Sequence, residues 1–126
     1  MVGQPIRVLI ADDQNCARRG LRALLSTWPA VELVGEASNG QEAIRLVEER
    51  RPDVVLMDAR MPVLDGLEAT RLIKSRGQKV RVIVLTMQGV NEQDALAAGA
   101  DFFLLKGFRP EELYEAIRSQ PHSVAR

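Results

Sequence analysis

Short, almost continuously apolar runs recur five times along the chain, and stretches with a helical repeat separate them. The runs predict strands over 6–11, 31–36, 54–57, 80–85 and 102–105. Four of the five contain few polar residues, which is typical of strands that helices cover on both faces of a sheet. Strands that alternate with helices form parallel sheets with right-handed crossovers. The pattern therefore predicts an α/β domain built on a parallel sheet.

The stretches between the runs place apolar residues three and four positions apart, the spacing of one helix face. The first such face contains Leu21, Leu24, Leu25 and Trp28. Similar spacing recurs at 43–47, 67–73 and 113–117, and a shorter helix over 95–98 is expected to end at Gly99. Five strands and five helices in alternation predict a doubly wound five-stranded sheet with the strand order 2-1-3-4-5.

Length and composition narrow the class of protein. The 126 residues, 46% of them apolar, suit one domain over 1–119, and 120–126 reads as a tail or the start of a linker. Lys and Arg together number 17, as do Asp and Glu, so no basic excess indicates direct nucleic-acid binding. No apolar run approaches the ~20 residues that span a bilayer. With one cysteine, Cys16, the expected location is the cytoplasm.

Polar residues stand where four of the predicted strands end. Asp12 and Asp13 follow the first strand, Asp58 follows the third, Thr86 the fourth and Lys106 the fifth. In an open parallel sheet, ligands bind beyond the carboxyl ends of the strands. We therefore expect these five side chains to converge on one crevice.

The three aspartates are candidate ligands of a metal ion. Adjacent aspartates after a strand are most often solvated loop residues or a helix N-cap. The presence of Asp58 at a neighbouring strand end favours a site, because clustered carboxylates repel one another unless a cation compensates. Mg²⁺ fits this oxygen-rich set, with Asp13 and Asp58 as direct ligands and Asp12 acting through water. One cysteine and one histidine do not supply a site for a softer metal.

Asp58 is also the candidate nucleophile. A carboxylate can accept a phosphoryl group to form an aspartyl phosphate, a transfer that asks the protein mainly for positioning and charge neutralisation. Mg²⁺ and Lys106 would supply positive charge, and the hydroxyl of Thr86 would donate to a phosphoryl oxygen. Taken singly, Lys106 is as well explained as a surface lysine and Thr86 as an ordinary strand residue. Their joint placement favours the phosphoryl-transfer site.

These residues lie in segments that resemble the receiver domain of two-component response regulators, which has a flavodoxin/CheY-like (βα)5 fold. The resemblance extends from residue 6 to about residue 118 and rests on Asp12-Asp13, 58–66 (DARMPVLDG), Leu85-Thr86 and 98–106 (AGADFFLLK). The segments 18–25 and 34–40 resemble the NarL/LuxR-type branch of that family.

The resemblance implies that a sensor histidine kinase phosphorylates Asp58 in the presence of Mg²⁺, with the backbone carbonyl of Arg60 as a further metal ligand. Thr86 and Phe103 would then move, and the face formed by the fourth helix, fifth strand and fifth helix would shift. Arg60 and Gln88 would tune dephosphorylation. The domain would be a signalling phosphoacceptor rather than an enzyme. Its partners would include a second copy of the chain in a homodimer, and a DNA-binding output domain would lie beyond this chain.

The chain departs from the family pattern in two places. The segment 87–94 is shorter than in most relatives, by roughly half a helical turn of ~3.6 residues, which predicts a shortened or distorted fourth helix. Gly107 follows Lys106 where many relatives carry proline or aspartate. A proline would make a cis peptide bond accessible there, whereas a cis bond to Gly107 would cost ~2.5–4 kcal/mol.

Three other interpretations each account for part of the pattern. A haloacid-dehalogenase-type phosphatase would carry a second aspartate where Arg60 stands. A flavodoxin-like electron carrier would need a phosphate-binding loop where Asp12 and Asp13 would repel a flavin phosphate. A stand-alone or degenerate receiver that acts as a protein-binding module stays open, because of the atypical fourth helix.

Overall fold

Five parallel strands form one sheet in the computed structural model, which describes residues 3–87 and 91–119. The strands are β1 (Ile6–Ala11), β2 (Val31–Ala37), β3 (Val54–Asp58), β4 (Arg81–Thr86) and β5 (Phe102–Leu105). Their order across the sheet is β2-β1-β3-β4-β5, as predicted, and the strand bounds agree with the predicted ones to within one residue.

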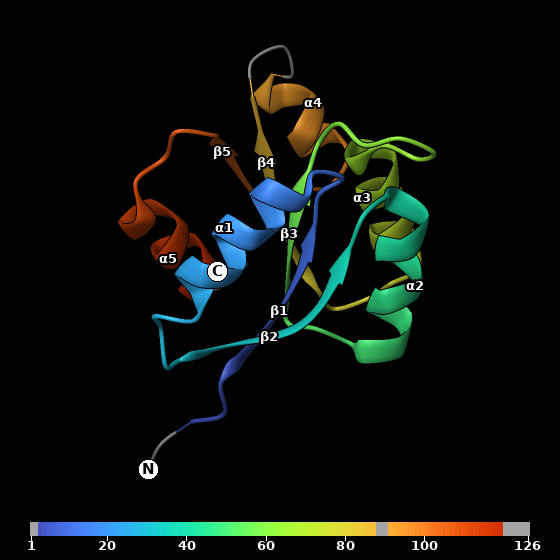
Figure 1. The fold of residues 1–126 in the computed structure, drawn as a ribbon. Helices are drawn as coiled ribbons and strands as arrows, with labels where there is room; N and C mark the ends of the chain where they lie inside the picture. Colours follow the sequence, from blue (N-terminus) through green and yellow to red (C-terminus); the bar gives the residue numbers. More distant parts are fainter. Residues whose placement is uncertain (1–2, 88–90, 120–126) are drawn as a thin grey trace, which may run out of the picture.

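Helices pack on both faces of the sheet (Figure 1). They are α1 (Asn15–Leu25), α2 (Gly40–Arg50), α3 (Gly66–Ser75), α4 (Glu92–Ala97) and α5 (Pro110–Arg118). Buried side chains of α1 and α5 join one apolar cluster, whereas those of α2, α3 and α4 join the other. None of the helices in the described part of the chain is long and apolar enough to cross a membrane.

Strand β3 lies in the middle of the sheet, and all five of its residues are buried. Val55 and Met57 join the cluster beside α2 and α3, whereas Val54 and Leu56 join the cluster beside α1 and α5. Since successive side chains of a strand point to opposite faces, a strand covered on both sides must be apolar throughout. Burial of this strand fixes the position of Asp58 at its carboxyl end.

The fourth helix is short, as the sequence predicts. It has six residues, and the side chain of Asn91 caps it by accepting from the backbone N–H of Asp94 at 2.8 Å. It stops before Gly99, whose φ of 105° places that residue in the left-handed region. The neighbouring Gln88, assigned to dephosphorylation tuning, lies outside the described residues.

Gly107 has a conformational role of its own at the end of β5. Its φ is 101°, a backbone conformation that a proline cannot adopt, and the described residues contain no cis peptide bond. The loop after Lys106 therefore follows a path that differs from an Xaa–Pro turn.

Candidate functional site

The carboxyl edge of the sheet holds a cavity of about 400 Å³. Its lining residues come from the ends of β1, β3, β4 and β5 and from the start of α1: Asp13, Gln14, Ala17, Asp58, Arg60, Thr86, Met87 and Lys106. Asp12 is 2% exposed and contacts Lys106, which lines this cavity. The five residues predicted to converge at strand ends are therefore brought together.

Asp12 is a buried carboxylate whose oxygens both have partners. Oδ1 accepts from the backbone N–H of Gln14 at 2.9 Å, and Oδ2 accepts from Nζ of Lys106 at 3.0 Å. Its backbone N–H donates to the carbonyl of Ala37 at 3.0 Å, which extends the pairing of β1 with β2 by one residue. Burying a carboxylate is costly unless it is hydrogen-bonded and charge-compensated, and both conditions hold here.

Asp58 ends β3 and is 9% exposed, so its carboxylate lines the cavity with little contact to solvent. Burial raises the pKa of Asp58 from 3.8 to about 6; the positive charge of Lys106 opposes this rise, and the charge of Asp12 adds to it. The amine of Lys106 lies 3.8 Å from Oδ2, and the backbone N–H of Arg60 lies 3.4 Å from Oδ1. The carboxylate is thus held in place while its charge is incompletely compensated.

The acidic cluster fits a small, hard cation. One carboxylate oxygen from each of Asp12, Asp13 and Asp58 lies within 4.8 Å of the others. Oxygens on opposite sides of one Mg²⁺ ion lie about 4.2 Å apart, given bonds of about 2.1 Å. The cluster has close to this size, consists of oxygen donors alone and opens to the cavity through Asp13, which is exposed.

Thr86 and Lys106 end the neighbouring strands β4 and β5. The backbone N–H of Lys106 donates to the carbonyl of Thr86 at 2.7 Å, so the two strand ends are tied together. Thr86 is 1% exposed but lines the cavity beside Asp58. A hydroxyl and an amine therefore border the same space as the Asp58 carboxylate.

Phe103 packs on the opposite face of the sheet from Phe102, as alternation predicts. It is partly buried against the α2–α4 side and lines a second cavity of about 430 Å³, together with Glu92 of α4 and Glu112 of α5. Lys106 lines both cavities, so it lies between the acidic site and the α4–β5–α5 face.

Two glycines that sequence analysis left without a role shape the site. A Cβ on Gly66 would lie 1.9 Å from the carbonyl oxygen of Asp58, and the N–H of Gly66 donates to the carbonyl of Ala59 at 2.8 Å. A Cβ on Gly40 would lie 2.1 Å from the carbonyl oxygen of Leu64. Both are close approaches of backbone to backbone, and a glycine at a helix start is the signal that could have indicated them.

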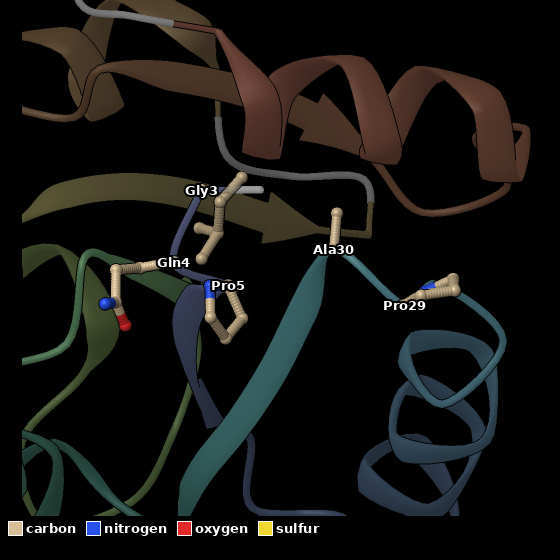
Figure 2. Close-up of a pocket in the computed structure, with 6 residues that line it drawn as sticks. Gly3, Gln4, Pro5, Pro29 and Ala30 are labelled. Carbon is tan, nitrogen blue, oxygen red and sulfur yellow. The ribbon is translucent and has the colours of Figure 1, made fainter. Parts of the chain in front are cut away.

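Another cavity, of about 490 Å³, lies at the amino ends of β1 and β2 (Figure 2). Its lining residues are Gly3, Gln4, Pro5, Ile6, Pro29 and Ala30. None of these carries an ionisable side chain, so this cavity offers no group for acid–base, nucleophilic or metal chemistry. The acidic cavity at the carboxyl edge is the better candidate site.

The model of the response regulator receiver domain matches residues 8–118. The chain belongs to the receiver domain family. It is 43% identical over 110 residues to the uncharacterised transcriptional regulatory protein YhcZ of Bacillus subtilis, an alignment that covers 86% of this chain and 51% of YhcZ. It is 38% identical over 117 residues to the nitrate/nitrite response regulator NarL of Escherichia coli, covering 90% of this chain and 54% of NarL.

Solved structures agree with this family. The receiver domain of the response regulator NarL from Mycobacterium tuberculosis matches with a TM-score of 0.86 and 33% identity, covering 91% of this chain and 94% of that domain. A LuxR-family DNA-binding response regulator from Staphylococcus aureus matches with a TM-score of 0.83 and 32% identity, covering 89% of this chain and 95% of that one. The chain is thus a NarL/LuxR-type receiver, a phosphoacceptor domain with a signalling role, and it spans about half the length of the curated relatives that it matches.

Proposed function

We propose that this receiver domain takes a phosphoryl group from a sensor histidine kinase onto Asp58. The observation that carries the proposal is the position of this carboxylate, at the end of β3 in a cavity that also contains Asp13, Thr86 and Lys106. An oxygen of Asp58 would attack the phosphorus atom while the bond from phosphorus to the donor's histidine nitrogen breaks. The leaving imidazole keeps that electron pair and takes up a proton.

Each neighbour has a role that its contacts support. Lys106 already reaches both Asp12 and Asp58, so its amine can follow a new negative charge on Asp58. The hydroxyl of Thr86 would donate to a phosphoryl oxygen. Asp13 and Asp58 would hold Mg²⁺ directly, with Asp12 acting through water and the backbone carbonyl of Arg60 as a further ligand. The bound ion would neutralise charge on the phosphoryl group.

The phosphoryl group would change the α4–β5–α5 face through Thr86 and Phe103. The cavity beside Phe103 supports this, because it leaves space on the route between the site and α4. The short α4 makes this face smaller than a longer helix would. We propose that the altered face controls a DNA-binding output domain in the full regulator, and that a homodimer is one of its signalling states.

The domain would act in the cytoplasm. The proposed reaction ends with the phosphoryl group on Asp58 and its hydrolysis from there. A haloacid-dehalogenase-type phosphatase needs an acid two residues beyond its nucleophile, where this chain has Arg60. The domain would therefore assist its own phosphorylation and dephosphorylation without turning over a separate substrate.

Phosphorylation with acetyl phosphate tests the assignment. With Mg²⁺ present, the intact mass should rise by one phosphoryl group, and the gain should disappear in Asp58→Asn or after chelation. Asp94→Asn, which neutralises an aspartate in the first turn of α4, is the matched control and should label like wild type. Undiminished labelling of Asp58→Asn would place the phosphoryl group elsewhere.

A further inference from the structure

Arg18 of α1 reaches back to the turn that carries Asp12 and Asp13. Its Nη1 donates to the backbone carbonyl of Asp12 at 2.5 Å, and its Nη2 donates to the side chain of Asn15. Its Nε lies 3.4 Å from a carboxylate oxygen of Glu36 in β2. The side chain of Arg18 is 16% exposed, so it is mostly buried while it makes these contacts.

The N-cap residue of α1 makes no side-chain cap, in contrast to those of α2, α3 and α4. Side chains of Asn39, Asp65 and Asn91 cap α2, α3 and α4. Gln14 at the start of α1 makes no side-chain cap, and the first turn of α1 contains no acidic residue. An uncapped helix start leaves backbone groups to find other partners. Arg18 supplies a different restraint, from the next turn of the same helix.

Holding the Asp12 carbonyl restrains the position of Asp13. The peptide group that joins these two residues is planar, so a hydrogen bond to its oxygen fixes the orientation of the whole unit. The Cα of Asp13 belongs to that unit, so the restraint reaches the backbone of Asp13, whose side chain is exposed. Asp12 is fixed on both sides, through its carbonyl by Arg18 and through its carboxylate by Lys106 and Gln14.

We infer that Arg18 is a positioning residue for the metal-binding carboxylates: it locks the β1–α1 turn so that Asp13 and Asp12 face one cation. This inference rests on the Mg²⁺ site of the proposed function. It depends on the fork of the guanidinium, which reaches three partners at once. A lysine carries the same charge but is a single point donor and does not replace the fork.

Arg22 offers a matched control on the same helix. Its Nη1 lies 2.6 Å from a carboxylate oxygen of Glu36, so Arg22 shares that partner with Arg18. The side chain of Arg22 is 49% exposed, and within the described residues it makes no hydrogen bond to the β1–α1 turn. Removing either arginine deletes one positive charge near the acidic cluster. By charge alone, each change should strengthen the binding of a cation. A positioning role for Arg18 predicts the opposite result, namely that loss of Arg18 weakens the binding of the cation.

Titration of the metal-free protein with MgCl2, followed by NMR at the amides of residues 12–14, measures the affinity directly. We expect Arg18→Gln and Arg18→Lys to weaken Mg²⁺ binding about tenfold, a typical loss for residues that orient metal ligands. Arg22→Gln should bind as wild type or more tightly. Before metal is added, amide exchange at Gln14 should be faster in both Arg18 variants than in Arg22→Gln.

The outcomes separate the two claims. If wild type binds no Mg²⁺, the proposed metal site is wrong and the inference falls with it. If wild type binds and Arg18→Gln binds as tightly as Arg22→Gln, the metal site stands and the positioning role is refuted. Should Arg18→Gln fail to fold, Arg18→Lys alone carries the test, because it keeps the positive charge and loses only the fork of the guanidinium. That variant should still bind Mg²⁺ more weakly than wild type, and an unchanged affinity would refute the role.

Discussion

The amine of Lys106 lies 3.0 Å from Oδ2 of Asp12, a carboxylate 94 positions away that is 2% exposed. The same amine is 3.8 Å from Asp58, so before phosphorylation its closer partner is the buried Asp12. The lysine thus has a structural role in the resting state in addition to its proposed role toward the phosphoryl group. Among the described residues, Lys106 is the cation that forms an ion pair with the Asp12 carboxylate, so its loss leaves a buried carboxylate incompletely compensated.

We predict that Lys106→Ala lowers the free energy of unfolding by about 1–2 kcal/mol, less than for a fully buried pair because the lysine is partly solvated. Urea unfolding at pH 7.5 measures this, with a double-mutant cycle that adds Asp12→Asn. The loss should be much smaller in the Asp12→Asn background. Phospho-Asp58 should still form slowly in Lys106→Ala, but spectral changes at Phe103 should be lost. Equal losses in the two backgrounds would show that the two side chains are not coupled.

The raised pKa of Asp58 predicts how the stability of the domain changes with pH. The folded protein holds this proton up to about pH 6, whereas the unfolded chain loses it near 3.8, so unfolding releases a proton between those values. Stability from this group is therefore greatest at low pH and falls as pH rises through about 6. At pH 8 in the presence of a chelator, the free energy of unfolding of Asp58→Asn should exceed that of wild type by on the order of 2 kcal/mol.

That advantage should shrink as the pH falls from 6 toward 4, because folded wild type then takes up a proton at Asp58 that most unfolded chains do not yet bind. Adding Mg²⁺ at pH 8 should stabilise wild type more than Asp58→Asn, because a ligand that binds the folded state alone stabilises it. Denaturant unfolding across the pH range, with and without Mg²⁺, gives both comparisons. A difference between the two proteins that did not vary with pH would argue that burial does not control this carboxyl group.

The convergence of the site could be predicted because it depends on topology alone. Once apolar runs and helical repeats define a parallel sheet, polar residues at the strand ends must meet, however distant they are in sequence. Asp12 and Lys106 were therefore expected to lie close together. The same reasoning gave the opposite faces of Phe102 and Phe103, because alternation along a strand is a local property.

The partners of individual side chains could not be predicted in this way. Nothing in the pattern indicates that Lys106 lies nearer Asp12 than Asp58, since that depends on loop geometry within an ångström. In the sequence, Arg18 lies on the polar side of a helical repeat, which is typical of a solvated residue. Its hydrogen bond to the carbonyl of Asp12 is seen only in the structure. The contact between Gly66 and the Asp58 carbonyl depends on how closely α3 starts beside β3.

That contact predicts a large effect from a small change. A Cβ at residue 66 would lie 1.9 Å from a backbone oxygen, which has no flexible end to move aside. Gly66→Ala should lower the free energy of unfolding by about 3 kcal/mol, the upper part of the range for overpacking. Gly20→Ala is the control, because Gly20 lies within α1 with nothing within 4 Å of an added Cβ. It should be stabilising by about 0.8–1 kcal/mol from helix propensity. Similar stabilities for the two variants would contradict the close approach.

Val63 in the loop after β3 is a candidate for stabilisation. Its φ is 71°, a left-handed conformation that β-branched residues rarely adopt, and it is 72% exposed. Val63→Asn should raise the free energy of unfolding by about 1 kcal/mol, because asparagine tolerates this conformation and little packing is lost. Val63→Ile keeps the β-branch and serves as the control, with no gain expected. Thermal unfolding of the three proteins decides the matter, and an asparagine variant no more stable than the isoleucine variant would argue against strain here.

Arg60 lines the cavity two residues beyond Asp58, where water must approach a phosphoryl group. A long side chain at this place restricts that approach and occupies space that water would need. We predict that Arg60→Ala accelerates the decay of phospho-Asp58 several-fold, corresponding to about 1 kcal/mol of barrier. Arg60→Met retains length without charge and should decay at a rate close to wild type if bulk is the cause. The measurement is loss of phosphoprotein after removal of acetyl phosphate, at constant Mg²⁺. If the methionine variant decays as fast as the alanine variant, the charge of Arg60 controls the lifetime; if neither differs from wild type, Arg60 has no tuning role.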